Sequence, residues 1–362
     1  MSRLSDDAVR SLRVAAQHLH RSRRLSVVEL VRHLTGVQAQ VLSAAGLALR
    51  ARTTGLKSEQ VDRARVRERS IVLTWAMRGT LHLIAAEDYG WLVPLVTGPS
   101  VANSHRRLKQ EGVPADQPDK AVRLIAQMLE REGPLTRPEI SERLKQKGVQ
   151  VAGQAIAHLV WQAAAAGLIC YGPERDGKQC FVLVKDWIGK TKSMEREAAL
   201  AEIALRYLKA HAPARPADLA FWSGIPMGDA NRAWKAIADR LVEVDTVRGP
   251  RWTLRTKRID HPSGVVRLLP AFDEYLLGWK DRDVVVAADH RAKINRGGGW
   301  LHPVVLADGE VLATWSTNRT PKSLTVDIAA CARLSPAVRR GLVAEAKDMG
   351  AFLGVPVDLE LD

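Results

Sequence analysis

Residues 134–184 read PLTRPEISERLKQKGVQVAGQAIAHLVWQAAAAGLICYGPERDGKQCFVLV, and this stretch decides the fold class. Thr136 and Glu139 have the spacing of a capping box, which predicts the start of a helix. Another helix is expected over 151–166. Apolar runs on either side of the turn at 173–178 then predict a strand, a wing tip and a strand. This order of helices and hairpin is typical of a winged-helix unit.

The same order extends outward from this stretch in both directions. Before it, apolar residues at helical spacing predict a helix that ends at Gly133, which completes a unit over 118–190. A second copy covers 195–258. Residues 1–110 fit a looser version, whose hairpin is expected at 71–75 and 78–84. The sequence therefore predicts three tandem winged-helix units.

The last part of the chain changes to short strands. Asp308-Gly309 stands between two apolar runs and is a strong signal for a two-residue hairpin. A helix is expected over 336–349. We therefore predict a small C-terminal β domain over 262–362 that ends with this helix, within an α+β fold.

The composition favours a soluble, cytoplasmic protein of several domains. The chain has 362 residues, of which 46% are hydrophobic and 26% charged, as in ordinary globular proteins. Its three cysteines form no paired framework and none of the spacings that bind zinc. No signal peptide or membrane-spanning run is recognisable. We expect no metal and no cofactor, and we expect a monomer.

The charge of the chain predicts a polyanionic partner. Lys and Arg number 54 against 40 acidic residues, a net charge of +14. Residues 1–110 hold 18 basic and 8 acidic groups, whereas residues 259–362 hold 12 and 14. Such an excess is typical of nucleic-acid binding, although a solvated basic face is the alternative. The arginines that we expect to bind phosphate are Arg21, Arg23, Arg24, Arg63, Arg65, Arg67 and Arg69.

The segment Gly36-Val37-Gln38-Ala39-Gln40 contains two glutamines that bracket one small residue. Side chains two residues apart point the same way on extended backbone and diverge on a helix. Gly36 can end the preceding helix, which favours the extended interpretation. An amide is a poor general base, but its carbonyl oxygen can hold a water and face a developing positive charge. From the residues alone, a structural hydrogen-bonding pair remains the alternative.

Three segments together resemble the winged-helix DNA glycosylase family of the AlkZ type. They are Val37-Gln38-Ala39-Gln40, Trp75-Ala76-Met77-Arg78-Gly79-Thr80-Leu81-His82, and Leu269-Pro270-Ala271-Phe272-Asp273-Glu274-Tyr275-Leu276-Leu277-Gly278 with Gly298-Gly299-Trp300. The resemblance covers essentially the whole chain. It implies a C-shaped molecule of three winged-helix units with a β-barrel domain, and a catalytic Gln-aliphatic-Gln motif at Gln38 and Gln40.

The resemblance also implies a substrate class. Gln40 places the chain in the Gln-aliphatic-Gln branch, which is associated with self-resistance to DNA-alkylating antibiotics. A purine alkylated at N7 is cationic, so it leaves as a neutral base without a general acid. The implied activity is therefore a monofunctional DNA glycosylase for bulky or crosslinking N7-alkylpurine adducts in double-stranded DNA. A non-enzymatic winged-helix protein, either a transcriptional regulator or an adduct-shielding binder, is the alternative.

Five further residues are candidates for the same site. Arg78, Thr80 and His82 alternate on an expected strand, so they would share one face and line the site or contact DNA. Asp273 and Glu274 are the acidic alternatives for catalysis. As neighbours on an expected strand they would point to opposite faces, so we favour a structural role for both.

Overall fold

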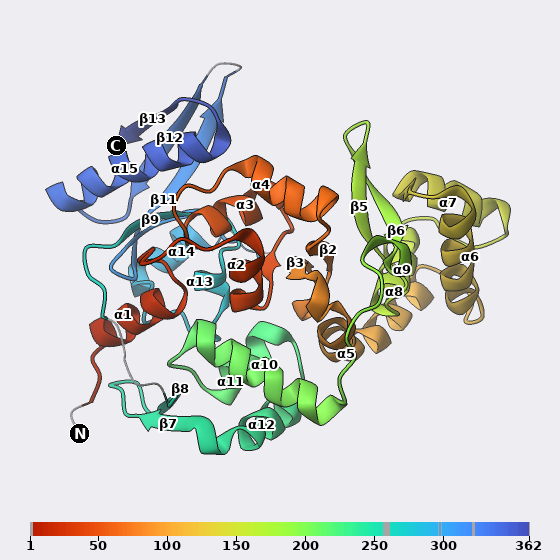
Figure 1. Ribbon diagram of the computed structural model, residues 1–362, viewed down its shortest axis with the longest axis horizontal. Coiled ribbons are helices and arrows are strands. Elements are labelled where there is room, and N and C mark those ends of the chain that lie inside the picture. Colours follow the sequence, from red (N-terminus) through yellow and green to blue (C-terminus); the bar gives the residue numbers. More distant parts are fainter. Residues whose placement is uncertain (1–2, 256–260, 296, 298, 321–322, 362) are drawn as a thin grey trace.

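The computed structural model describes residues 3–255, 261–295, 297, 299–320 and 323–361, and it has the mixed α+β fold expected from the sequence (Figure 1). Gly298 of the Gly298-Gly299-Trp300 segment lies outside these residues, as do residues 256–258 at the end of the third expected unit. In the described part of the chain, no helix is long and apolar enough to cross a membrane.

The chain begins with two helices whose N-terminal N–H groups are capped by serine. Ser5 accepts a hydrogen bond from the N–H of Ala8, and Ser26 forms a capping box with Glu29. The elements of this first part are α1 (Asp6–Ala16), α2 (Val27–Leu34), β1 (Val37–Gln38), α3 (Leu42–Arg50), α4 (Ser58–Asp62), a π-helix (Arg63–Arg67), β2 (Ile71–Trp75), a 3-10 turn (Met77–Gly79) and β3 (Leu81–Ala85).

The hairpin of this part differs from the expected one. Its second strand begins at Leu81, whereas the sequence pattern predicts a strand from Arg78. Arg78 and Gly79 both have positive φ, of 57° and 71°, so the chain turns here before the strand can start. Arg78 therefore lies in the turn between β2 and β3.

A long helix follows the hairpin, where the sequence pattern indicates that the first unit has ended. This helix is α5 (Tyr89–Gln110), and it contains Pro94 and Pro99. Proline lacks a backbone N–H and normally ends a helix, so the two prolines conceal the helical pattern. The interpretation of residues 1–110 as a unit that ends on its hairpin misses this helix.

The middle of the chain follows the order expected from the quoted stretch. The capping box of Thr136 and Glu139 is present at the start of α7. The turn at the wing tip is shorter than expected, because Asp176 and Gly177 with φ of 51° and 70° reverse the chain by themselves. The elements are α6 (Gln117–Glu132), β4 (Leu135–Thr136), α7 (Arg137–Gln146), α8 (Ala155–Ala165), β5 (Ile169–Arg175), β6 (Lys178–Leu183) and α9 (Val184–Trp187).

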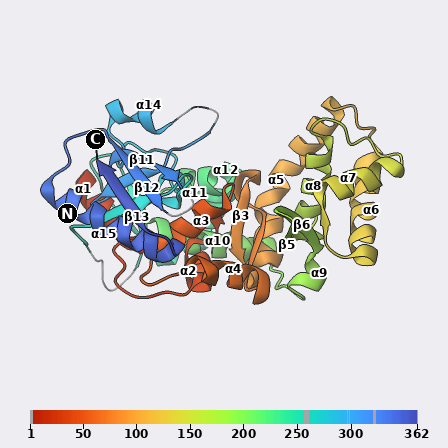
Figure 2. The same ribbon diagram turned by 90° about the horizontal axis from the view of Figure 1, so that it is seen from above.

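The next part repeats three helices and a hairpin. Its elements are α10 (Arg196–His211), α11 (Pro216–Ser223), α12 (Met227–Ala236), a 3-10 turn (Ala238–Arg240), β7 (Leu241–Val244) and β8 (Arg251–Leu254). Figure 2 shows α10, α11 and α12 between α6 and α7 at one end of the molecule and the C-terminal strands at the other. The division of the chain into three winged-helix units stays a prediction.

The C-terminal part contains an open sheet instead of the expected barrel. The described strands pair in the linear order β13-β12-β11-β10-β9, so β9 and β13 are its two edges. The helix α15 packs against both of these strands, and the edges do not meet. The elements are β9 (Val266–Leu269), α13 (Glu274–Leu277), a 3-10 turn (Ala288–His290), α14 (Arg291–Ile294), β10 (Val304–Ala307), β11 (Glu310–Arg319), β12 (Leu324–Ala330), α15 (Pro336–Leu353) and β13 (Val357–Leu361).

In this C-terminal part, one predicted hairpin is present and one strand was not predicted. The hairpin at Asp308-Gly309 is confirmed, with φ of 45° and 84° at its two turn residues. The strand β13 was not expected. It follows α15 and pairs in parallel with β12.

A six-stranded sheet in the order β1-β3-β2-β5-β6-β4 joins the first and the middle parts of the chain. The link between them is the pairing of Leu73 in β2 with Tyr171 in β5. One sheet therefore crosses the boundary between the first two expected units. It places β1, which carries Gln38, at its edge.

Buried ion pairs connect the first part to the C-terminal part. Arg52 is fully buried, and its guanidinium donates to both carboxylate oxygens of Asp273 at 2.7 and 2.9 Å. Glu345 of α15 pairs with Arg21 and Arg50. Burial raises the pKa of Glu345, but the charges of Arg50 and Arg21 outweigh burial and hold that pKa below its usual value.

We expect the substitution Asp273→Asn to lower the free energy of unfolding by about 3–5 kcal/mol, because it leaves the buried guanidinium of Arg52 without its counter-ion. Urea unfolding followed by circular dichroism measures this change. The control is Asp239→Asn, whose carboxylate is exposed, and which we expect to change stability by less than about 0.5 kcal/mol. Equal stability of the two variants would contradict the structural role of Asp273.

Candidate active site

The Gly36-Val37-Gln38-Ala39-Gln40 segment has the non-helical backbone expected from its sequence. Helix α2 ends at Thr35 in the left-handed conformation, and Gly36 follows with φ of 133°. This φ is one that residues with a Cβ rarely adopt, so the backbone conformation favours glycine, and a Cβ here would also lie 2.8 Å from Cε at the flexible end of Met77. The segment then pairs with β3, with Val37 opposite Leu83 and Gln38 opposite His82.

Gln38 is buried and bound on two sides. Its side-chain Oε1 accepts a hydrogen bond from Nη2 of Arg78 at 2.8 Å. Its backbone N–H donates to Oε1 of Glu274 at 2.8 Å. The side-chain amide is thereby held in one orientation. A carbonyl oxygen has two lone pairs, so Oε1 can accept one more hydrogen bond.

Gln40 is exposed and lies next to a cavity. Its Oε1 accepts a hydrogen bond from the N–H of Leu81 at 3.4 Å, which is long and leaves the side chain weakly held. The cavity, of about 530 Å³, is also lined by Thr136, Arg137, Tyr171, Lys178 and Phe181. Both glutamine side chains therefore bind the segment from Arg78 to Leu81. Gln38 binds Arg78 from a buried position, and Gln40 binds Leu81 from an exposed one.

Arg78 connects the Gln38 side chain to helix α11. Besides Gln38, its guanidinium donates to the backbone oxygen of Trp222. Burial lowers the pKa of Arg78, and the charge of Glu274 acts in the opposite direction. Gly224 lies directly against this turn, since a Cβ there would be 3.1 Å from Cα of Arg78. The end of α11 thus packs on the turn that holds Gln38.

Glu274 and Asp273 are both buried and both bound to protein groups. Glu274 accepts hydrogen bonds from the N–H of Gln38 and, at 3.1 Å, from Nε1 of Trp222. Burial raises the pKa of Glu274, and the charge of Arg78 opposes this shift. Asp273 caps α13 and pairs with Arg52. The expectation that the two acids are neighbours on a strand is wrong, because they begin a helix.

Arg78, Thr80 and His82 do not share a strand face, contrary to the sequence interpretation. Arg78 lies in the turn, Thr80 donates its hydroxyl to the backbone oxygen of Met77, and only His82 lies in β3. His82 is fully buried, and its Nδ1 lies 2.9 Å from the backbone oxygen of Thr80. Burial, and next the charge of Arg78, lower the pKa of His82 to about 3. Its imidazole is therefore a neutral core group.

Trp222 is the site residue that the sequence did not reveal. It lies in α11, far along the chain from Gln38, and it binds Glu274 through its indole and Arg78 through its backbone oxygen. Local patterns contain no signal for such a contact. A fully buried tryptophan needs a partner for its N–H, and only the folded chain shows which group supplies it.

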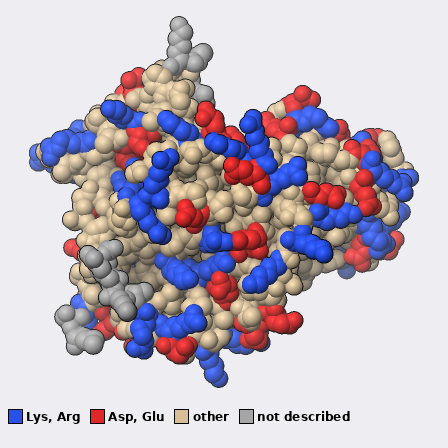
Figure 3. All heavy atoms as spheres, in the orientation of Figure 1, with Lys and Arg blue, Asp and Glu red and all other residues tan. Residues whose placement is uncertain are grey.

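The arginines of residues 1–110 that we expected to bind phosphate fall into two groups, one bound within the protein and one exposed. Arg21 pairs with Glu345, and Arg65 is buried and donates to the backbone oxygen of Gly172, so neither is available to phosphate in this structure. Of the arginines that we expected to bind phosphate, Arg23, Arg24, Arg63, Arg67 and Arg69 are exposed. Figure 3 shows basic side chains spread over one face of the molecule, with acidic ones between them.

This geometry places one neutral amide, that of Gln40, at the surface, and the amide of Gln38 below it with ionisable groups around it. Gln40 lines the cavity, whereas Gln38 is buried and is not part of the cavity's described lining. Glu274 has both oxygens engaged and no exposed surface, so it acts on a ligand only through Gln38 and Arg78. The site therefore suits a reaction that needs oriented dipoles more than a strong acid or base.

Comparison with known proteins identifies relatives along nearly the whole chain. The family model described as "DNA glycosylase AlkZ-like" matches residues 31–352. A relative from Streptomyces sahachiroi, named "Interstrand DNA cross-link repair glycosylase", is 32% identical over 323 residues, which are 84% of this chain and 85% of the relative. The solved structure of the Streptomyces sahachiroi DNA glycosylase AlkZ matches 100% of both chains, with a TM-score of 0.85 and 28% identity.

We expect the imidazole of His82 to stay neutral between about pH 8 and pH 5, because its folded pKa is about 3 and that of an unfolded histidine is about 6.5. Nitrogen-15 NMR of the ring measures its protonation. Because the unfolded state takes up the proton first, stability falls as the pH drops from about 6.5 toward 3.

The substitution His82→Asn removes this contribution. Between pH 7 and pH 5, the free energy of unfolding of the wild type should fall by about 2 kcal/mol more than that of the variant, as measured by urea unfolding. The control His105→Asn changes an exposed histidine and should leave the pH dependence as in the wild type. A ring that titrates near pH 6.5 would contradict the description of His82 as a neutral core group.

Proposed function

Because this chain belongs to the AlkZ-like family of DNA glycosylases, we propose that it hydrolyses the N-glycosidic bond of cationic N7-alkylpurine adducts, including bulky and crosslinking ones. The chain is a DNA glycosylase, and its substrate is DNA. The finer proposal rests on one observation: Gln38 is fixed beneath the surface by Arg78 and Glu274, while Gln40 is exposed beside a cavity.

The chemistry of a cationic adduct fits a site without an accessible acid. When the bond from C1′ to N9 breaks, its electron pair remains on the purine and neutralises the positive ring. Oxocarbenium character develops on the sugar, as in other glycoside hydrolyses. A water then adds to C1′ and releases its proton to solvent. The products are a neutral alkylated base and an abasic site.

We assign complementary roles to the two glutamines. The carbonyl oxygens of Gln38 and Gln40 face the sugar, where preorganised dipoles stabilise the developing charge and hold the attacking water. Arg78 fixes the direction of the Gln38 amide. The buried charge of Glu274 offsets the positive charge of Arg78, which would otherwise oppose an oxocarbenium ion nearby.

An apolar cavity supports the part of the proposal that concerns bulky adducts. It has a volume of about 450 Å³, and Val41, the residue after Gln40, is one of the residues that line it. Trp300 lines it with 42% of its surface exposed and makes an edge contact with Phe272 at 4.8 Å between ring centroids. An exposed tryptophan in the cavity that Val41 also lines offers a flat apolar surface for a large substituent.

The Streptomyces sahachiroi relative is named for the repair of interstrand DNA cross-links, which supports crosslinked DNA as a further substrate. The Gln-aliphatic-Gln motif at Gln38 and Gln40 supports a role in self-resistance to an alkylating natural product. The family assignment favours an enzyme over a transcriptional regulator or an adduct-shielding protein. The monomeric state and the cytoplasmic location stay predictions from the sequence.

The decisive experiment is a single-turnover comparison of three duplexes that carry N7-methylguanine, a bulky N7 adduct or uracil. We expect release of both cationic bases at comparable rates and no release of uracil, which is neutral and needs protonation to leave. Free base is measured by chromatography. Efficient release of uracil would mean that an acid within the site carries the reaction and that this mechanism is wrong.

We expect Gln40→Ala to lower the single-turnover rate on the bulky adduct by about 100-fold to 1,000-fold, the loss typical when one stabilising dipole is removed from an active site, with unchanged affinity for DNA. The matched control Gln127→Ala removes an exposed amide on α6 and should keep the wild-type rate. If Gln40→Ala weakened binding as much as the rate, Gln40 would be a DNA-contact residue instead.

A further inference from the structure

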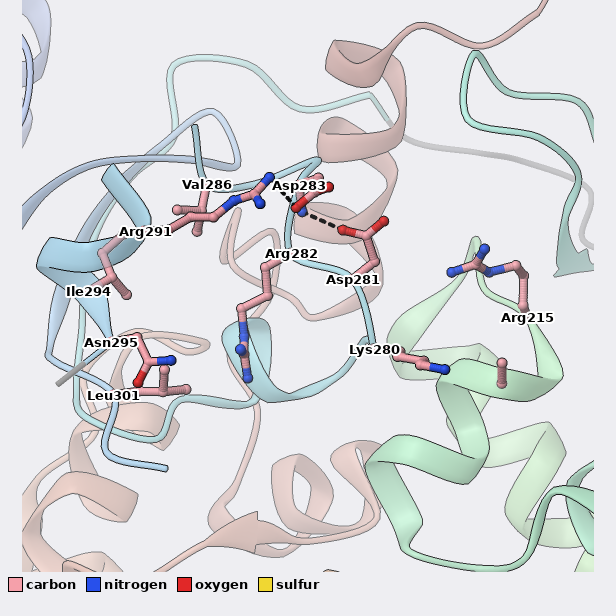
Figure 4. A pocket seen from close by; sticks show the side chains of 11 residues that line it. Arg215, Lys280, Asp281, Arg282, Asp283, Val286, Arg291, Ile294, Asn295 and Leu301 are labelled. Atoms are coloured by element: carbon pink, nitrogen blue, oxygen red, sulfur yellow. Dashed lines mark hydrogen bonds and ion pairs between the residues drawn. The ribbon is translucent and has the colours of Figure 1, made fainter. Parts of the chain in front are cut away.

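A third, basic cavity lies between the start of α11 and the segment that links α13 to α14 (Figure 4). Its volume is about 550 Å³. The charged residues in its lining are Arg215, Lys280, Asp281, Arg282, Asp283 and Arg291. Cations thus outnumber carboxylates around this cavity.

Most of these charges already have a partner in the protein. Arg291 pairs with Asp283 at 2.5 Å, and Arg215 pairs with Asp218 at 3.4 Å. Asp281 accepts a hydrogen bond from the N–H of Asp283 at 2.7 Å. Within the described part of the chain, no carboxylate lies within ion-pair distance of Lys280 or Arg282. These two cations are the ones that the cavity leaves without a counter-ion.

Arg282 is the more unusual of the two, because it is half-buried. Its Nε donates to the backbone oxygen of Leu276 at 2.6 Å, which leaves the remaining N–H groups of its guanidinium for another acceptor. Burial lowers the pKa of Arg282. Figure 4 shows its side chain extending away from the carboxylates of Asp281 and Asp283. A partly desolvated cation in such a position is stabilised by an external anion.

The cavity is linked to the candidate active site through helix α13. The charge of Arg282 lowers the pKa of Arg78, the residue that holds Gln38, so the two guanidinium groups are electrostatically coupled. Helix α13 connects them physically, since Leu276 binds Arg282 and Glu274 binds Gln38. An anion bound at Arg282 would therefore also lower the positive potential at Arg78.

We propose that this cavity binds one phosphate of the DNA backbone through Arg282, while Lys280, which lies on the α11 side of the cavity in Figure 4, adds its positive charge. A guanidinium presents paired N–H donors that match two phosphate oxygens, and an ammonium adds a point charge. The proposal rests on the proposed function, because it takes duplex DNA as the ligand. In this proposal, the bound phosphate holds the DNA strand in place next to Gln38 and Gln40.

The first test measures binding of unmodified duplex DNA over a range of salt concentrations. A phosphate contact contributes about 0.9 to the slope of log K against log salt, so Arg282→Gln and Lys280→Gln should each lower that slope by up to about one. Arg282→Lys, which keeps the charge, should retain most of the slope. The control Arg340→Gln removes an exposed arginine on α15 and should leave the slope unchanged.

The second test identifies the phosphate. In a series of duplexes, each has a single phosphate replaced by a neutral methylphosphonate. At one position the wild type should lose about tenfold in affinity, as for one charge-assisted hydrogen bond, and Arg282→Gln should lose nothing further there. At all other positions, methylphosphonate replacement should lower the affinity of the wild type and of Arg282→Gln by the same factor.

Two outcomes would overturn the proposal. One is that no methylphosphonate position is coupled to Arg282. The other is that inorganic phosphate occupies the cavity with millimolar or better affinity while the DNA salt slope of Arg282→Gln equals that of the wild type, which would make it a site for a free anion. Because these tests use undamaged DNA, a failure to excise adducts leaves their result unaffected.

Discussion

The buried carboxylate of Glu274 is the group on which the arrangement of this molecule depends. It has no exposed surface, so its oxygens must find donors within the protein. The donors are the backbone N–H of Gln38 and the indole of Trp222. One carboxylate of the C-terminal part therefore ties the edge of the six-stranded sheet to helix α11, and none of these three elements can move without leaving an unsatisfied polar group.

This contact also explains why Gln38 and Gln40 differ. Gln38 is bound through its backbone by Glu274 and through its side chain by Arg78, so its amide is fixed before any ligand arrives. Gln40 has one long hydrogen bond and open space beside it. A fixed and an adaptable amide next to each other fit the proposed hydrolysis, in which one amide would orient the water and the other would adapt to adducts of different size.

Much of the fold could be predicted from the sequence, because local signals determine it. The capping box at Thr136 and the Asp308-Gly309 hairpin depend only on neighbouring residues, and both are present. The predictions that were wrong concern elements that depend on contacts distant in the sequence or on residues that obscure the local pattern. Two prolines conceal α5. The packing of α15 on both edge strands replaces the expected barrel by an open sheet.

The candidate site was predictable to a smaller extent. The extended backbone at Gln38 follows from Gly36. The positive φ of Arg78, which moves it from the strand into the turn and toward Gln38, has no sequence signal, because arginine rarely adopts this conformation. The contacts of Glu274 and Trp222 join segments far apart in the chain, so they appear only once the chain is folded.

The N–H of Gln38 that binds Glu274 points away from β3, since the N–H groups of Val37 and Ala39 are the ones placed to face that strand. An edge strand normally offers such outward groups to a strand from another molecule, which is a common route to aggregation. Here the donor is already taken, β1 is only two residues long, and α3 begins at Leu42. The same carboxylate that orients the motif therefore also closes the sheet against self-association, so variants of Glu274 risk poor solubility as well as a misplaced glutamine.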